Sequence, residues 1–420
     1  MMIDARITDI RTSFCTIVFR LWRVPLSAET GTSAKCRALA VAAQVAPAKA
    51  RTLQLSWEPP KRAPFMRCLI LAAGRFDDGL RAEIAAGREP RLDVFELARV
   101  LKADVVDFTD VARSRSSAVR FAARVAGKSP AVAALGFEMR GQYDAFFTTG
   151  EDIGLPLALL LKASFAKCSH TMIGHTLFPA RKQAFFKVAR VGSAIDRVLV
   201  HATSEERLAI DELGFAPSKV ERLNYQADQH FFDPAVSSSP PESNLICAAG
   251  QLLRDYDCLV DAVRDLPVRV QIAAGSPWID RSLKPRGPLP ANVSWGKLNR
   301  YELRALYARS ALAVVPILQN HYQTGIATIL EMMAMGKCVI ATRTHGQTDT
   351  IVDGVTGVYV PPGDSLALRR TIERLLADPE DAARIGRAAR KFIEEKASLD
   401  LFVERLASAT RAGHAAHFGV

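Results

Sequence analysis

Short apolar runs alternate with longer amphipathic segments along the chain from Met66 onward. This alternation predicts buried strands covered by helices, as in a parallel sheet. In the first half the predicted strands are "CLILAA", "ADVVDF", "YDAFFTT", "TMIGH", "RVLVHA" and "VERLNY". Predicted helices there include "LPLALLLKASFAK" and "SEERLAIDELG", and the second carries Glu205 and Glu206 in its first turn, where carboxylates favour a helix start.

A stretch crowded with Pro and Ser, "DPAVSSSPPESN", interrupts this pattern at residues 233–244 and predicts a linker. A second alternating set follows, with predicted strands "NLICAAG", "VRVQIAAG", "ALAVVP", "CVIAT" and "VYVPP". Helices are predicted to begin near Asp257, Arg300, Thr324 and Ser365. Two further helices are predicted after Pro379, over Glu380 to about Lys396 and Leu399 to about Arg411.

The chain is therefore predicted to be an α/β protein with two doubly wound, Rossmann-like domains. No period of about 20 to 50 residues repeats within either half, which excludes a solenoid. The predicted parts are a basic arm at 1–65, a first domain at 66–235, a linker at 236–244, a second domain at 245–396, and a C-terminal helix and tail at 397–420.

Residues 1–65 hold ten Lys or Arg against four acidic residues and show little periodicity. Three interpretations stay open: a targeting segment, a disordered arm, or upstream sequence that is not native. We expect an arm that the fold does not need. The folded protein is expected to start at Met66, where "MRCLILAAGRF" resembles the first strand of an α/β domain.

Composition limits which classes of function the protein can have. The 420 residues are 49% hydrophobic and 24% charged, and no run reaches the roughly 20 apolar residues that a membrane span needs. Seven scattered cysteines predict reduced, mostly buried thiols and a cytoplasmic setting. The net charge of +11 favours anionic partners. A nucleic-acid partner is disfavoured because much of that charge lies before Met66 and no basic, aromatic strip is apparent.

Two such domains place a cleft between the carboxyl edges of their sheets. The stretch "HYQTGIATILEMMAMGK" at residues 321–337 belongs at that cleft, with a helix starting at Thr324 or Gly325. Free N–H groups at a helix start attract phosphate, and a Gly lets an anion approach the backbone. Ile326 and Thr328 lie in the same first turn and are candidate donor-site residues.

Glu331 is the single carboxylate in this otherwise apolar helix. Helical side chains lean toward the helix N-terminus, so Glu331 is predicted to project back toward Thr328 and the cleft. There it would accept hydrogen bonds from a ribose attached to the bound phosphates. The alternative is an exposed Glu on a partly buried helix.

The block "GIATILEMMAMGKCVIATRTHGQTDTIVDGVTGVYVPPGDSLAL" resembles the donor-binding region of glycosyltransferase family 4, whose enzymes have the GT-B fold. Supporting segments in the same order are "TTGEDIGLPLALLLK", "MIGH", "YQADQHFFDP" and "AAGQLLRDYDCLVDAV". The likeness spans about Met66 to Ala407. The resemblance implies two Rossmann-like domains facing across a cleft, with C-terminal helices crossing back to the first domain.

Residue by residue, the resemblance implies that Glu331 binds the nucleotide ribose. The family Glu that contacts the transferred sugar falls on Gln323, and one of two diphosphate-binding cations falls on Gln251. The other cation position is Arg254, whose alternative role is a surface Arg paired with Asp255 or Asp257. His175 resembles the family His that faces the donor sugar near its reactive carbon; its alternative is a structural His.

The function expected is a retaining, metal-independent transfer of a glycosyl group from a nucleotide-diphosphate sugar, with no cofactor. Catalytic candidates are His175 and Arg254. "DYD" at 255–257 has the spacing of a metal-binding pair, but Asp257 is predicted to be a helix N-cap. The alternatives are a nucleotide-sugar epimerase or hydrolase of the same fold, and a non-catalytic nucleotide-sugar-binding protein. A dinucleotide dehydrogenase is disfavoured because "AAGRFDDG" lacks the spaced glycines.

The partners implied are a nucleotide-sugar donor and a lipid, polysaccharide or small-molecule acceptor. Peripheral contact with the inner face of a membrane stays open, although the sequence shows no evident amphipathic anchor.

Overall fold

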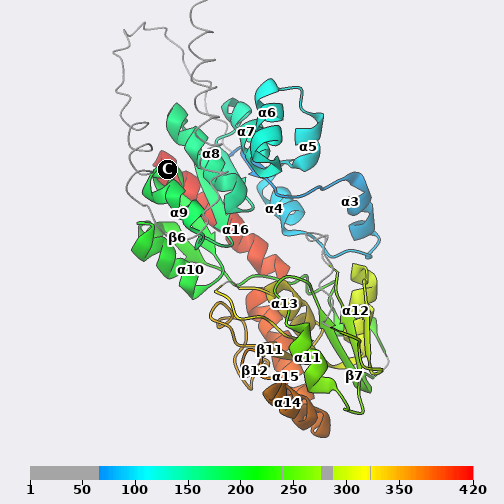
Figure 1. Ribbon diagram of the computed structural model, residues 1–420. Helices are drawn as coiled ribbons and strands as arrows, with labels where there is room; N and C mark the ends of the chain where they lie inside the picture. Colours follow the sequence, from blue (N-terminus) through cyan, green and yellow to red (C-terminus); the bar gives the residue numbers. More distant parts are fainter. Residues whose placement is uncertain (1–65, 239, 276–286, 322, 420) are drawn as a thin grey trace, which may run out of the picture.

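The computed structural model describes residues 66–238, 240–275, 287–321 and 323–419, and these form two lobes, each built on a six-stranded parallel sheet (Figure 1). The predicted arm at 1–65 lies outside the described residues. The α/β class with two doubly wound sheets is confirmed. No helix within the described ranges is long and apolar enough to cross a membrane.

The sheet of the first lobe has the strand order β2-β1-β3-β4-β5-β6. All six predicted strands are confirmed, with bounds β1 Cys68–Leu71, β2 Asp104–Val106, β3 Ala145–Thr148, β4 Ser169–Gly174, β5 Arg197–Val200 and β6 Val220–Arg222. Every residue of β1, β3 and β4 is buried, as continuous apolar runs predict for a parallel sheet covered on both faces.

Helices cover both faces of this sheet. Their bounds are α3 Asp78–Ala85, α4 Asp93–Leu101, α5 Phe108–Arg113, α6 Ser117–Ala126, α7 Lys128–Glu138, α8 Glu151–Ser164, α9 Ala180–Lys187 and α10 Thr203–Arg207. The segment predicted as one helix, "SEERLAIDELG", divides into α10 and a wider π-helical turn, η3 Leu208–Glu212. Short 3-10 turns complete the lobe: η1 Arg140–Gln142, η2 Val191–Ala194 and η4 Pro217–Lys219.

The sheet of the second lobe has the order β12-β11-β10-β7-β8-β9. Its strands are β7 Glu242–Ala249, β8 Arg269–Ala273, β9 Val293–Gly296, β10 Ser310–Val315, β11 Cys338–Thr342 and β12 Val358–Val360. The sequence pattern missed β9, whose four residues "VSWG" are too short and too polar for a periodic signal. β7 begins at Glu242, inside the stretch predicted as linker, because Glu242 pairs with Ser310; the register shifts before the next pair, Ile246 with Leu312.

The second lobe's helices are α11 Tyr256–Val263, α12 Arg300–Arg309, α13 Ile326–Ala334, α14 Ser365–Ala377 and α15 Pro379–Phe392, with turns η5 Pro234–Val236 and η6 Ile393–Ala397. The prediction that Asp257 caps α11 is wrong. The N-cap is Asp255, whose carboxylate accepts the Cys258 N–H at 3.1 Å, because α11 already begins at Tyr256.

Only the last helix, α16 Leu399–Phe418, crosses back to the first lobe, whereas α15 stays against α13 and β11 (Figure 1). Leu399, Phe402, Val403 and Leu406 of α16 join the core beneath α4. Their i, i+3, i+4, i+7 spacing gives one apolar face, and burying each contributes roughly 2 kcal/mol. The crossing therefore ties the second lobe to the first.

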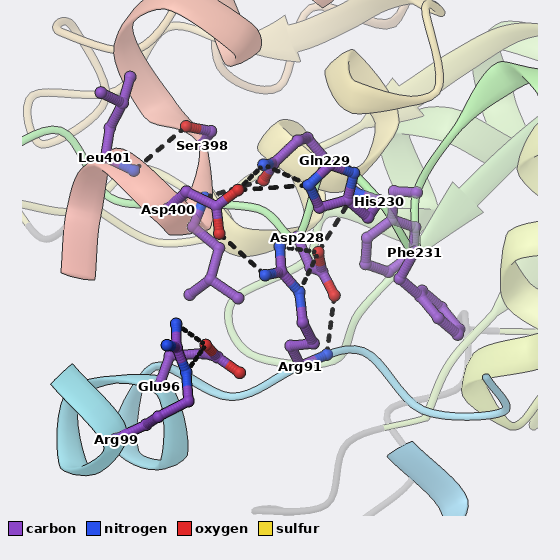
Figure 2. Close-up of polar contacts among 12 residues, drawn as sticks. Arg91, Glu96, Arg99, Asp228, Gln229, His230, Phe231, Ser398, Asp400 and Leu401 are labelled. Atoms are coloured by element: carbon purple, nitrogen blue, oxygen red, sulfur yellow. Dashed lines mark hydrogen bonds and ion pairs between the residues drawn. The ribbon is translucent and has the colours of Figure 1, made fainter. Parts of the chain in front are cut away.

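Two chain segments run side by side where the lobes join. Ala227 N–H donates to Ala397 at 3.1 Å, and Leu399 N–H donates back to Ala227 at 3.0 Å. Arg91, from the loop before α4, bonds Asp228 on the first crossover and Asp400 on the second, each at 2.8 Å (Figure 2). Arg91 of the first lobe thus forms ion pairs with both crossover segments.

The described cysteines agree with the prediction of reduced, mostly buried thiols. Each is free, and four of the five are buried: Cys68, Cys168, Cys247 and Cys338. Cys15 and Cys36 lie outside the described residues.

Candidate functional site

The strand order of the second lobe reverses between β7 and β10, so the loops after these two strands diverge at the carboxyl edge of the sheet. Two backbone bonds tie the loops together: Asp255 N–H to Pro316 at 3.1 Å and Leu318 N–H to Leu253 at 2.9 Å. The first loop carries Arg254 and the second leads into α13. A ligand site is expected at this switch point.

Arg254 is buried at this point, with 7% of its surface exposed. Its Nε donates to the Ala249 carbonyl at 3.0 Å, and its Nη1 to the Leu252 carbonyl at 2.8 Å. Its Nη2 lies 3.3 Å from Thr328 Oγ1, in the first turn of α13. Burial lowers the pKa of Arg254. No carboxylate among the described residues pairs with it, so the surface-pair alternative is not what the structure shows.

Two glycines let the guanidinium lie against the backbone. Gly325 is the N-cap of α13 with φ +84°, and a Cβ there would meet Arg254 Nη1 at 3.2 Å. A Cβ on Gly250, with φ +97°, would meet Arg254 Nη2. The helix begins at Ile326, slightly later than predicted, because Gly325 adopts the left-handed conformation.

The first turn of α13 is uncapped by any side chain. Ala327 is exposed, while Gly325, Ile326 and Thr328 are half-buried, so this helix end is not plugged by protein. The N–H groups of this first turn and the Arg254 guanidinium lie next to one another. Together they make a positively charged site that is open to solvent.

Glu331 lies two turns into α13 and is 8% exposed. Its Oε1 accepts a hydrogen bond from Arg300 Nη1 at 2.7 Å, and its Oε2 accepts one from the Tyr307 hydroxyl at 3.3 Å. The ion pair raises the pKa of Arg300, and burial raises that of Tyr307. Both partners belong to α12, so Glu331 faces the α12 side of the site. A carboxylate has about four acceptor positions, so two remain for a ligand.

Gln323 and Ile326 line a small space that also touches the first lobe through His201 and Tyr225. Its volume of about 10 Å³ suits a single water. Gln323 Nε2 donates to Thr350 Oγ1 at 3.2 Å, while its Oε1 is buried without a partner. The lobes are therefore in contact beside the start of α13.

The remaining predicted donor-site residues face the protein. The Thr324 hydroxyl donates to Asn320 Oδ1 at 3.0 Å. Gln251 is 2% exposed and its Nε2 donates to the Ala274 carbonyl at 3.1 Å, leaving Oε1 buried and unpartnered. The structure thus brings Arg254, Gly325 and Thr328 into direct contact, and directs the Gln251 amide toward the end of β8.

His175 stands across the cleft, exposed at the carboxyl end of β4. Its Nε2 lies 2.9 Å from the Thr149 carbonyl, which can only accept, so Nε2 carries the proton. Its ring lies tilted by 40° to that of His201, with centroids 5.3 Å apart. Burial lowers the pKa of His201 to about 3. Among the described residues no hydrogen bond joins His175 to Arg254 or Glu331.

A buried polar network holds the loop after β4 in place. The Glu151 carboxylate accepts the His175 N–H at 2.9 Å, the Thr176 N–H at 3.3 Å and Lys182 Nζ at 2.5 Å. Although burial acts to raise it, Lys182 holds the pKa of Glu151 below its ordinary value. Glu205 accepts the Leu177 N–H at 3.0 Å, and burial raises the pKa of Glu205 to about 7.

Sequence reasoning missed Arg300, Tyr307, Glu151, Lys182 and Asp93. Asp93 begins α4 beside His175, and burial raises its pKa. Glu151 lay inside a quoted motif, "TTGEDIGLPLALLLK", so a carboxylate heading a helix after a buried strand was the available signal. Arg300 and Tyr307 carried none, because their relation to Glu331 depends on how α12 packs against α13.

Residues 232–392 match the family model of glycosyl transferases group 1. Over 280 residues the chain is 24% identical to the alpha-D-kanosaminyltransferase of Streptomyces kanamyceticus, a match covering 62% of this chain and 71% of that protein. Over 162 residues it is 31% identical to the D-inositol 3-phosphate glycosyltransferase of Xylanimonas cellulosilytica, covering 36% of this chain and 38% of that protein.

Solved structures resemble the whole two-lobed arrangement. Anabaena Alr3699/HepE, in complex with UDP-glucose, matches with a TM-score of 0.61 and 16% identity over 83% of this chain and 100% of that one. Sucrose-phosphate synthase from Thermosynechococcus elongatus matches with a TM-score of 0.61 and 17% identity over the same shares. Residues 232–392 thus resemble the group 1 glycosyl transferases, and the chain is a glycosyltransferase with the two-lobed GT-B fold.

Proposed function

We propose that this chain is a retaining, metal-independent glycosyltransferase of family 4 that takes its sugar from a nucleotide-diphosphate donor. The observation that carries this proposal is the environment of Arg254. This cation is buried, has no carboxylate partner among the described residues, and lies against the open first turn of α13. A buried charge held only by neutral groups is costly. An anionic ligand at this corner would offset that cost.

The donor diphosphate would lie between the Arg254 guanidinium and the N–H groups of α13's first turn. Arg254 is already fixed by two carbonyls, so little side-chain entropy is lost when an anion arrives. Because Gly325 has no side chain, the guanidinium and the start of α13 lie against one another and can bind the same anion. The Thr328 hydroxyl, 3.3 Å from Arg254 Nη2, is a second donor at the same place.

Glu331 would accept the two ribose hydroxyls with its free acceptor positions. Arg300 and Tyr307 hold the carboxylate in one orientation before ligand arrives. Arg300 would act on the ribose as a positioning residue, through its ion pair with Glu331. The transferred sugar would then lie toward Gln323 and, across the cleft, toward His175.

The reaction proposed breaks the bond between the anomeric carbon and the diphosphate oxygen. The leaving diphosphate keeps the electron pair, the acceptor oxygen bonds to the same face of the carbon, and the acceptor proton passes to the leaving group. Negative charge therefore grows on the diphosphate, where Arg254 and the α13 N–H groups stabilise it without metal or cofactor. His175, with Nε2 protonated and bound to Thr149, presents Nδ1 as an acceptor on the sugar side.

Two other functions use the same site. In an epimerase or hydrolase, water would take the acceptor's place. In a non-catalytic binding protein, Gln323 and Gln251 would stand where an active enzyme has a sugar-binding Glu and a diphosphate-binding cation. Both of their Oε1 atoms are buried without partners. The acceptor we propose is a lipid, a polysaccharide or a small molecule, used in the cytoplasm.

Incubation with a panel of nucleotide sugars, with and without candidate acceptors, separates these functions. The proposal expects nucleoside diphosphate release that depends on acceptor, with the product's anomeric configuration by NMR equal to the donor's, in excess chelator. Release without acceptor would support hydrolysis. Inversion, or activity that returns only with added magnesium, would contradict the mechanism.

A further inference from the structure

The first lobe carries a strongly basic face built by α5, α6 and the residues that join them to α7. Between residues 107 and 128 the chain has five cations and two carboxylates. Both carboxylates serve the capping box of α5, in which Asp107 and Asp110 bond each other's backbone N–H. The five cations are all exposed, and with one aromatic side chain they form what we call the basic face: Arg113, Arg115, Arg120, Phe121, Arg124 and Lys128.

These cations have no acidic partners within the described parts of the chain. Glu138, a carboxylate at the end of α7, accepts from the Ser116 hydroxyl at 2.6 Å. Lys128 lies 5.6 Å from the Phe108 ring. Elsewhere on the surface, Arg369 pairs with Glu373 and Arg405 with Glu221. The charge of the basic face is therefore left to an outside partner.

Phe121 lies on α6 next to two of these cations and has 48% of its surface exposed. Arg120 and Arg124 are one turn apart on one side of it, while Val119 and Ala126 on the opposite side are buried. An exposed aromatic side chain beside cations can enter the interface of a bilayer while the cations remain at the headgroups.

We propose that the basic face docks on an anionic lipid bilayer. A nucleic-acid partner fits less well, because strand binding uses several aromatic platforms in a row and this face offers one. The face spans parts of three helices and a loop, which explains why the periodicity of a single segment did not predict it. α5 starts at the carboxyl edge of the first sheet, where Phe108 N–H donates to Gly74 at 3.0 Å, so docking would hold the cleft-facing lobe against the membrane.

The test is co-sedimentation of the full-length chain with vesicles of phosphatidylcholine alone and of equal parts phosphatidylcholine and phosphatidylglycerol. Binding to the anionic vesicles alone is expected, and high salt should abolish it. The double variant Arg120→Ala with Arg124→Ala should lower partitioning about 30-fold, since each cation near a charged surface adds roughly fivefold. Phe121→Ala should lower it several-fold at constant charge.

The matched control is Arg370→Ala with Arg387→Ala, two exposed cations on α14 and α15 of the other lobe. It should bind as the wild type does, and all variants should share one unfolding midpoint. Equal binding by the Arg120, Arg124 double variant and the wild type overturns the proposal, because another part of the chain then provides the contact. So does a single-stranded oligonucleotide that binds the same face when anionic vesicles do not.

Discussion

Two buried carboxylates, one in each lobe, stand on helices that follow strands, yet the structure uses them differently. Glu151 is 3% exposed and receives Lys182 Nζ and two backbone N–H groups, with Lys182 itself 7% exposed at its side chain. Glu331 is 8% exposed and receives Arg300 and the Tyr307 hydroxyl, but 34% of the Arg300 side chain is open to solvent.

The difference is what the proposed roles require: a structural carboxylate at Glu151 and a ligand-binding one at Glu331. Three of about four acceptor positions of Glu151 are filled, by two N–H groups of the loop after β4 and by Lys182 Nζ. Only two positions of Glu331 are filled by protein, and its cation lies at the open edge of the site. Burial alone therefore does not tell the two apart; the number of positions filled by protein does.

The largest expected effect is on Lys182. Lys182→Met leaves the Glu151 carboxylate buried without its cation, and unfolding free energy should fall by about 3 to 5 kcal/mol. Denaturant titration measures this. A loss below about 1 kcal/mol would mean that the pair is solvated and that Glu151 is no more structural than Glu331.

The second prediction concerns pH and the neighbouring Glu205. Burial raises its pKa from 4.5 to about 7, so between these pH values the folded state binds more protons than the unfolded state. Stability contributed by this group is present below pH 4.5 and is lost as pH rises through 7, by roughly 3 kcal/mol. Glu205→Gln, which still accepts the Leu177 N–H, should remove this loss. Identical pH profiles for wild type and variant would contradict it.

The third prediction tests the cation of the donor side. Arg254→Met should weaken binding of nucleoside diphosphates about 10- to 100-fold in calorimetric titration, because charge-assisted hydrogen bonds to phosphate are lost. Arg343→Met is the control, since Arg343 is exposed and paired with Asp353. Equal weakening by both variants would indicate a general charge effect and no phosphate site at Arg254.

The smallest expected effect is on Arg300. Arg300→Met should cost only about 1 kcal/mol of unfolding free energy, because water can replace a half-open partner of Glu331. Comparing the unfolding free energies lost by Arg300→Met and by Lys182→Met tests whether Glu331 and Glu151 differ as described. A cost equal to that of Lys182→Met would make Glu331 a structural carboxylate too.

Local patterns predicted the fold well because parallel strands buried on both faces are continuous apolar runs, as in "CVIAT" for β11. They failed where a strand is short, as at β9, and where two acids compete for one cap, as at Asp255 and Asp257. Helix α16 was predicted as a helix, but its crossing to the first lobe came only from the family resemblance.

The site residues also divide into those that local patterns predicted and those that they did not. Arg254, Gly325 and Thr328 were predicted from a strand, a loop and a helix start, and these lie together because the strand order reverses between β7 and β10. Arg300 and Tyr307 could not be predicted, since their contact with Glu331 joins helices about 25 to 30 residues apart through tertiary packing alone. Lys182 is likewise 31 residues from Glu151.

The central claim is that a nucleotide diphosphate binds at the start of α13 with its ribose on Glu331. Thermal unfolding with a panel of nucleoside diphosphates tests it most directly, comparing wild type, Glu331→Ala, Glu331→Gln and the exposed control Glu404→Ala. At about 100 times its dissociation constant a nucleotide adds about 2.7 kcal/mol, a shift of a few degrees. We predict that shift in the wild type and Glu404→Ala and its loss in both Glu331 variants. An equal shift in all four proteins would contradict the account.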